Sequence, residues 1–114
     1  MSCFQINLSQ AASYLHRMAH LKLDQEEFTE AIALYERALE LRKRAYGGDS
    51  IQYGETLLAF AWCLNDANVR LSDALEFVDL AVAMFHLSTD GAHPKFIFSL
   101  ELKEEIEMKL KSRK

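Results

Sequence analysis

The chain has 114 residues, of which 50% are hydrophobic and 26% are charged, with only four Gly and one Pro. This length suits one domain around one core, and the scarcity of helix-breaking residues favours helices. The formal net charge of -4 offers no basic surface for phosphates, so we expect no nucleic-acid partner.

Cysteine usage and hydropathy predict a cytoplasmic protein. Cys3 and Cys63 are sixty residues apart without a CxxC pair, which indicates free thiols rather than a disulfide framework. The first residues lack the basic and apolar regions of a secretory signal. The longest apolar run, 57–64, is far shorter than a membrane span of about 20 residues, so no membrane partner is expected.

The first predicted pair of helices covers residues 9–23 and 28–46, and its polar join "DQEE" has capping-box spacing between Asp24 and Glu27. The second of these helices has two adjacent apolar stripes, which predict neighbours on two sides. Small residues at seven-residue steps mark the closest approach of a neighbour: Ala31, Ala38 and Ala45. Gly47 and Gly48 then predict a sharp corner, because glycine ends a helix without a Cβ penalty.

A second pair of helices, predicted at 51–64 and 71–87, repeats this plan. The first helices align at a step of 42 residues and the second helices at 43, as Ala19 and Ala61, and Ala31 and Ala74, illustrate. The extra residue predicts a slightly longer turn at "NDANVR". A repeat of this period is typical of stacked helical hairpins, in which each unit buries its apolar face against the next.

A last helix is predicted from Pro94, which suits the first helical position. Its apolar residues recur every fourth position on one stripe: Phe98, Leu102, Ile106 and Leu110. Glu and Lys fill most of the remaining surface, a pattern typical of a capping helix at the end of an array.

The stretch "EFTEAIALYERALEL" resembles the second helix of a tetratricopeptide repeat, with Phe28, Ala31, Tyr35 and Ala38 at the signature aromatic and small positions. Leu15, Met18 and Ala19 fill the large, large and small positions of the preceding helix. The resemblance implies an all-α fold: two antiparallel helical hairpins and a C-terminal capping helix, a short α-solenoid of about five helices. We therefore predict one domain over 1–114, with repeats at about 9–48 and 50–90 and a cap at about 94–112.

The corners resemble those of the kinesin light chain-like subclass of these repeats. The matching residues are Gly47, Asp49, Gly54 and Thr56 at the first corner, and Gly91, His93 and Pro94 at the second. The first corner departs from the pattern, because Ser50 and Ile51 stand where the subclass has a His-Pro pair.

The resemblance implies a binding groove lined by the first helix of each hairpin. Carried over residue by residue, the partner-binding positions are His16, His20, Asp24, Glu55, Leu58, Trp62, Asn65 and Asp66, with Ser13 and Leu23 beside them. Helix geometry independently places His16, His20 and Asp24 on one face. Trp62 could be an aromatic anchor for a partner, or could pack against the neighbouring hairpin.

No catalytic constellation is recognisable. A phosphate loop and a nucleophile with a His-carboxylate relay are both missing from the sequence, and Cys63 suits an apolar filler beside Trp62. Two histidines at i and i+4 could share a metal ion, with Asp24 as a third ligand, but the spacing is weak evidence. We therefore expect no cofactor, no metal and no enzymatic activity.

The sequence thus predicts an adaptor or scaffold that binds a peptide or protein surface in the concave groove of its hairpins. The three acids Asp24, Glu55 and Asp66 favour a basic or mixed apolar segment. The first alternative is a structural, self-associating homodimer, because about three repeats are usually needed for a stable stack and the chain shows two. Metal binding through His16 and His20 is a distant third.

Overall fold

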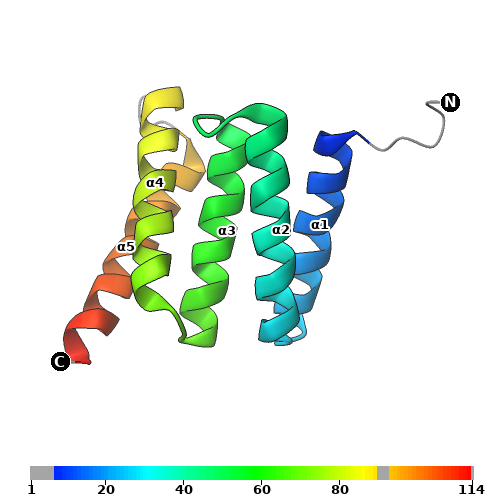
Figure 1. The fold of residues 1–114 in the computed structure, drawn as a ribbon. Coiled ribbons are helices and arrows are strands. Elements are labelled where there is room, and N and C mark those ends of the chain that lie inside the picture. The colour runs from blue at the N-terminus through cyan, green and yellow to red at the C-terminus, as the bar shows by residue number, and fades with distance from the viewer. Residues whose placement is uncertain (1–6, 90–92, 114) are drawn as a thin grey trace, which may run out of the picture.

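A computed structural model describes residues 7–89 and 93–113 (Figure 1). Five helices follow one another: α1 (Leu8–Asp24), α2 (Phe28–Tyr46), α3 (Ile51–Ala67), α4 (Leu71–Thr89) and α5 (Pro94–Ser112). These ranges contain no strand, which confirms the predicted all-α fold of about five helices. Within them, no helix combines the length and the apolar character that crossing a membrane requires.

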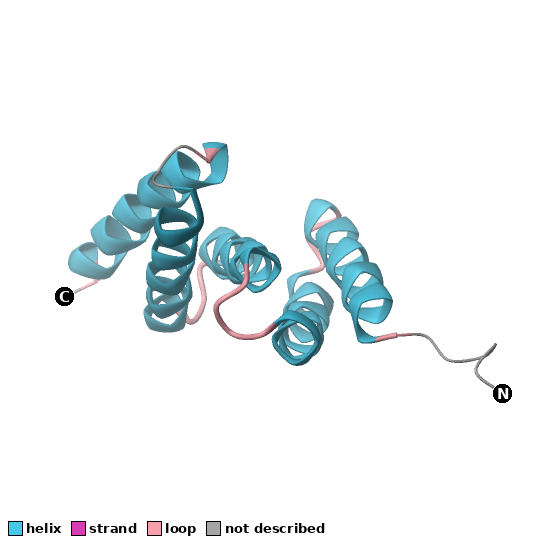
Figure 2. Ribbon diagram, turned by 90° about the horizontal axis from the view of Figure 1, so that it is seen from above, coloured by secondary structure: helices cyan, strands magenta, loops and turns pink. Residues whose placement is uncertain are grey.

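Each helix packs against the next one along the chain, and the five stand side by side from α1 to α5 (Figures 1 and 2). In addition, α3 contacts both α1 and α5, the two other first helices of the stack. Contacts that skip one helix are what a solenoid of hairpins requires, because each hairpin buries its apolar face against the following one. The helices α1 and α5 consequently lie at opposite ends of the array (Figure 1).

The turn after α1 differs from the predicted capping box. Asp24 is the last residue of α1, and Glu27, which precedes α2, makes no side-chain cap. Instead, Glu26 adopts a φ of 60°, and the backbone N–H groups of Glu26 and Glu27 donate to the carbonyls of Leu23 and Lys22, each at 2.9 Å. This is a Schellman motif, which satisfies the last carbonyls of α1 without any carboxylate.

The same motif ends α3, where Asn68 has a φ of 60° and lies 42 residues after Glu26. One residue separates Glu26 from α2, whereas two residues separate Asn68 from α4. The extra residue predicted in "NDANVR" is therefore confirmed, and it shifts the start of α4 to 43 residues after the start of α2.

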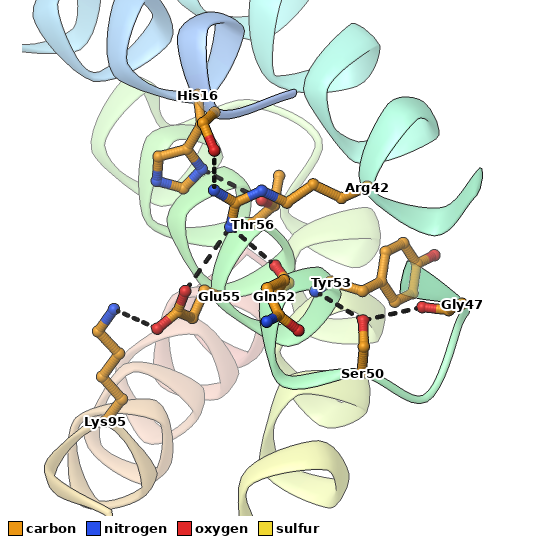
Figure 3. Close-up of polar contacts among 10 residues, drawn as sticks. His16, Arg42, Gly47, Ser50, Gln52, Tyr53, Glu55, Thr56 and Lys95 are labelled. Carbon is orange, nitrogen blue, oxygen red and sulfur yellow. Dashed lines mark hydrogen bonds and ion pairs between the residues drawn. The ribbon is translucent and has the colours of Figure 1, made fainter. Parts of the chain in front are cut away.

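The corner between the hairpins is held by Gly47 and Ser50. Gly47 has a φ of 95°, a conformation that a side chain would strain, and its N–H donates to the Lys43 carbonyl at 2.9 Å. The Ser50 hydroxyl donates to the Gly47 carbonyl at 2.9 Å and accepts from the Tyr53 N–H at 3.2 Å, which caps α3 (Figure 3). The two glycines of the sequence thus mark the corner as predicted.

The second corner begins α5 with His93 and Pro94. His93 Nδ1 accepts from the Lys95 N–H at 3.0 Å, so the imidazole caps the helix, and Pro94 occupies the first helical position as predicted. Gly91, part of the same predicted corner, lies outside the described residues. The predicted apolar stripe of α5 is confirmed, because Leu102 and Ile106 are buried and Phe98 and Leu110 are partly buried against the core.

Small residues stand where the helices approach one another. Ala31 and Ala38 of α2 and their counterparts Ala74 and Ala81 of α4 are all fully buried. At Gly54 of α3, an added Cβ would lie only 3.0 Å from Met84 Cβ on α4. These positions confirm that Ala31 and Ala38 mark close helix contacts, whereas Ala45, the third alanine of the predicted series, is only partly buried.

We expect the replacement of Ala38 by Leu to lower the free energy of unfolding by about 1–3 kcal/mol, because the added atoms have no room between packed helices. Ala33, which is exposed on the same helix, is the matched control, and Ala33→Leu should leave stability within about 0.5 kcal/mol. Urea denaturation followed by circular dichroism measures both. Equal effects of the two substitutions would contradict the assigned role of Ala38.

Candidate functional site

A groove of about 410 Å³ runs between α1 and α3 and is bordered at one side by α5. Its apolar lining consists of Leu23, Leu58, Ala59, Trp62 and Phe98. Its polar lining consists of His16, His20, Asp24, Glu55 and Lys95, and Tyr35 of α2 completes it. Four of the five helices therefore contribute to one concave site.

The structure brings six of the eight sequence-predicted site residues into this groove: His16, His20, Asp24, Glu55, Leu58 and Trp62. Asn65 and Asp66 are not part of the lining. The Asn65 side chain is buried and donates from Nδ2 to Glu105 Oε2 of α5 at 2.6 Å. Asp66 is exposed one helical turn beyond Trp62.

The aromatic part of the groove is formed by Trp62 and Phe98. Their ring centroids are 4.9 Å apart, and the Trp62 side chain is still 41% exposed. Both interpretations of Trp62 thus have a physical basis: the indole packs on the capping helix and also presents a large apolar surface to solvent. Rigid, partly exposed aromatic side chains of this kind commonly anchor partners.

Sequence reasoning missed four groove residues, Tyr35, Ala59, Lys95 and Phe98. Tyr35 and Phe98 had been assigned to packing, which they also perform. Lys95 comes into the groove because α5 lies against α3, a placement that no local pattern encodes.

A charged network closes the end of the groove near the start of α3 (Figure 3). Glu55 lies between two cations, with Lys95 Nζ at 3.1 Å from Oε2 and Arg42 Nη1 at 3.6 Å from Oε1. Arg42 is buried and also donates to the Gln52 carbonyl at 3.0 Å. Glu55 is therefore neutralised by the protein itself, so the acidic character predicted for this part of the groove is lost.

The importance of Arg42 could have been recognised in the sequence by comparing the two repeats. The residue 43 positions later, in the second repeat, is the fully buried Phe85. A buried guanidinium at a position that holds an aromatic ring in the other repeat is a departure from the repeat pattern. Buried charges require partners, and here the partners link α2 to α3 and, through Glu55, to α5.

His16 lies beside this network as a neutral, partly buried imidazole. Its Nδ1 is 3.1 Å from Thr56 Oγ1, and its ring packs edge-on against Tyr35 at 5.7 Å between centroids. Burial, assisted by the nearby Arg42 guanidinium, lowers the pKa of His16 from 6.5 to about 4. His16 thus acts as an uncharged hydrogen-bonding group at neutral pH.

The opposite end of the groove is acidic. Asp24 Oδ2 lies 3.7 Å from His20 Nε2, and both side chains are well exposed. Histidine is not permanently charged at neutral pH, so Asp24 lacks a permanent cation of the kind that neutralises Glu55. Among the residues that the structure describes, no three His, Cys, Asp or Glu side chains are grouped so that they could hold a metal ion.

Two buried groups near the groove, the Cys63 thiol and the Tyr35 hydroxyl, are not activated for chemistry. Burial, assisted by Asp66, raises the pKa of the Cys63 thiol to about 11, so the sulfur remains protonated and is a poor nucleophile. Burial also raises the pKa of Tyr35 strongly, and its hydroxyl has no hydrogen-bond partner in the described part of the chain. The arrangement can bind a ligand but offers no activated nucleophile.

A stack of antiparallel hairpins with a groove along its first helices defines a helical-repeat protein. Residues 10–85 match the family described as "Tetratricopeptide repeat". The chain therefore belongs to the tetratricopeptide repeat family, whose members generally mediate protein-protein interactions and are typically not enzymes. A comparison with curated proteins finds no match.

We expect the free energy of unfolding to decrease as the pH falls from about 6.5 to about 4, in part because of His16. In this range the unfolded chain binds a proton at His16 that the folded protein does not bind. The His16→Gln variant should lose this component, whereas His20→Gln, at an exposed position, should keep it. Urea denaturation at several pH values measures the effect, and identical pH profiles for the native protein and His16→Gln would contradict it.

Proposed function

We propose that this protein is a non-catalytic adaptor that binds a segment of another protein in the groove between α1 and α3. The observation that carries the proposal is a groove of about 410 Å³ whose apolar wall contains the partly exposed Trp62. Clefts with an apolar lining and a few convergent polar groups are the usual form of a binding site. Membership of the tetratricopeptide repeat family supports the same conclusion.

The residues proposed to contact the partner are those that the groove collects. Trp62 and Leu58 would supply apolar contact area, while His16, His20, Asp24 and Glu55 would supply hydrogen bonds and charge. We retain Asp66 as a rim residue, because it is exposed one turn beyond Trp62. Asn65 would act indirectly, by holding Glu105 and hence α5 at the border of the groove.

The groove assignment is tested with Trp62→Ala and a matched control, Tyr46→Ala. The two aromatic side chains are equally exposed, but Tyr46 is at the end of α2, outside the groove. We expect Trp62→Ala to lose a partner protein that the native chain and Tyr46→Ala both recover from a cell lysate, with an affinity loss of about tenfold or more.

Circular dichroism must show that both variants keep their helices, since Trp62 also packs on Phe98. Once the partner is identified, isothermal titration with the purified protein gives the affinity. Recovery of the same proteins by all three chains would mean that the groove is not the binding site.

Self-association is a second candidate function, favoured by the outer face of α1. Tyr14 and Leu21 on this helix are 57% and 48% exposed, and no further helix in the described residues covers them. A second copy could pack there and supply the missing repeat. Sedimentation velocity at several concentrations should then show dimers that the Tyr14→Ser, Leu21→Ser double variant lacks, whereas a single-chain mass throughout would exclude this role.

We further place the repeats in the kinesin light chain-like subclass and the protein in the cytoplasm. The long repeat supports the first assignment, since α4 starts 43 residues after α2. The helix-capping His93 followed by Pro94 at the second corner supports it as well. The buried, unpaired thiol of Cys63 suits a reducing compartment.

A further inference from the structure

The charges of the groove are distributed unequally along its length. The helices α1, α3 and α5 run in the same direction, because each is separated from the next by one antiparallel helix. The first halves of α3 and α5 bring together Glu55 and Lys95, and the buried Arg42 joins them from the end of α2, so this cluster of one carboxylate and two cations has a formal charge of +1. Asp24, at the end of α1, lies at the other end of the groove.

Asp24 is the carboxylate of the groove lining that no lysine or arginine among the described residues neutralises. Its side chain is 65% exposed, and its one ion-pair partner among the described residues is the exposed His20 at 3.7 Å. Asp66, one turn beyond Trp62 on α3, adds a second exposed carboxylate toward the same end. A cation entering here would meet negative charge without displacing a lysine or an arginine of the protein itself.

The surface beside Asp24 is apolar. Leu23, Leu58 and the exposed part of Trp62 form the wall of the groove there. A long basic side chain fits such a site well, because its hydrocarbon stem covers apolar surface while its charged head stays near carboxylates and water. A guanidinium or ammonium over the indole would also gain a cation–π interaction.

Tyr35 gives an independent indication of a missing hydrogen-bond partner. This residue lines the groove, is itself fully buried, and its hydroxyl oxygen has no partner within the described residues. Buried polar groups are nearly always paired in folded proteins, so an unpaired one in the lining of a groove suggests a partner that arrives with the ligand. A basic side chain brings several N–H donors.

We propose that the groove recognises a peptide segment whose anchor is an arginine or lysine flanked by apolar residues, with its cationic head at Asp24 and its stem against Trp62. This inference rests on the proposed function and specifies the chemistry of the partner. The occupant is a segment of another protein whose cation complements the acidic end of the groove at Asp24, since the cluster of Glu55, Lys95 and Arg42 makes the other end cationic.

The test uses three pools of acetylated and amidated nine-residue peptides with randomised Ala, Leu, Val and Ser flanks. The central residue is arginine, its uncharged isostere citrulline, or glutamate. Trp62 is the one tryptophan of the chain, so its fluorescence reports occupancy of the groove directly. We expect the arginine pool to bind about five- to tenfold more tightly than the citrulline pool, and the glutamate pool to bind least.

The Asp24→Asn variant removes the carboxylate charge and leaves the apolar contacts of the groove in place, so it measures the contribution of the charge alone. This variant should lose most of the preference for arginine, keeping only the part that comes from the indole and from Asp66, with its affinity for the citrulline pool unchanged. Glu40→Gln, which removes one exposed carboxylate of α2 outside the groove, is the matched control and should keep the preference for arginine.

The outcomes distinguish the two proposals. Equal binding of the arginine and citrulline pools to the native protein, or tighter binding of the glutamate pool, would overturn the basic anchor and leave groove binding intact. Persistence of the full arginine preference in Asp24→Asn would also overturn it. If no pool changes the fluorescence of the folded protein, the basic anchor is overturned, and the comparison of Trp62→Ala with Tyr46→Ala decides groove binding separately.

Discussion

The whole architecture depends on close packing between helices at small residues. Fully buried alanines recur at equivalent places in α2 and α4, and Gly54 leaves no room for a side chain opposite Met84. Because the helices approach closely at these points, each helix contacts its neighbours in the chain, and α3 also contacts α1 and α5, the other first helices of the stack. The first helices then lie near enough to one another to form the two walls of a groove.

Polar contacts fix the register between these first helices. His16 bonds to Thr56, Glu55 to Lys95 and Asn65 to Glu105, and in each case the two residues are 40 positions apart in the chain. A recurring separation of this kind is expected when one structural unit is repeated along an axis, since equivalent helices meet with a constant offset. The contacts join α1 to α3 and α3 to α5, so the capping helix is oriented by the same interactions that shape the groove.

The same network decides what the groove can recognise. A buried Arg42, at the position that Phe85 occupies in the next repeat, requires a carboxylate, and Glu55 supplies it together with Lys95. One end of the site thereby has a formal charge of +1, with an uncharged His16 beside it, while Asp24 keeps the other end acidic. The charge of the binding surface therefore differs between its two ends, although the sequence had suggested that Glu55, like Asp24 and Asp66, favours a basic or mixed apolar segment.

Local sequence patterns were sufficient to predict the five helices, both corners and the small residues of the core. The reason is that helical periodicity, glycine and proline act through neighbours a few positions away. The turn after α1 was predicted wrongly, because Asp24 and Glu27 have capping-box spacing but Glu26 takes a left-handed conformation that satisfies the helix end with backbone groups alone. Six of the predicted site residues came together because they share the inner faces of α1 and α3, which follow from the repeat.

By itself, then, the sequence determined the helices, their order and the face of each that is buried, since these depend on short-range periodicity. Only the tertiary structure decided that Lys95 and Phe98 border the groove, that Asn65 is used to hold α5, and that Glu55 is neutralised. Each of these outcomes depends on charges and hydrogen bonds between side chains some 40 positions apart on α3 and α5, or on the buried Arg42 of α2. Such pairings arise from the packing of the helices, which the short-range patterns of the chain do not encode.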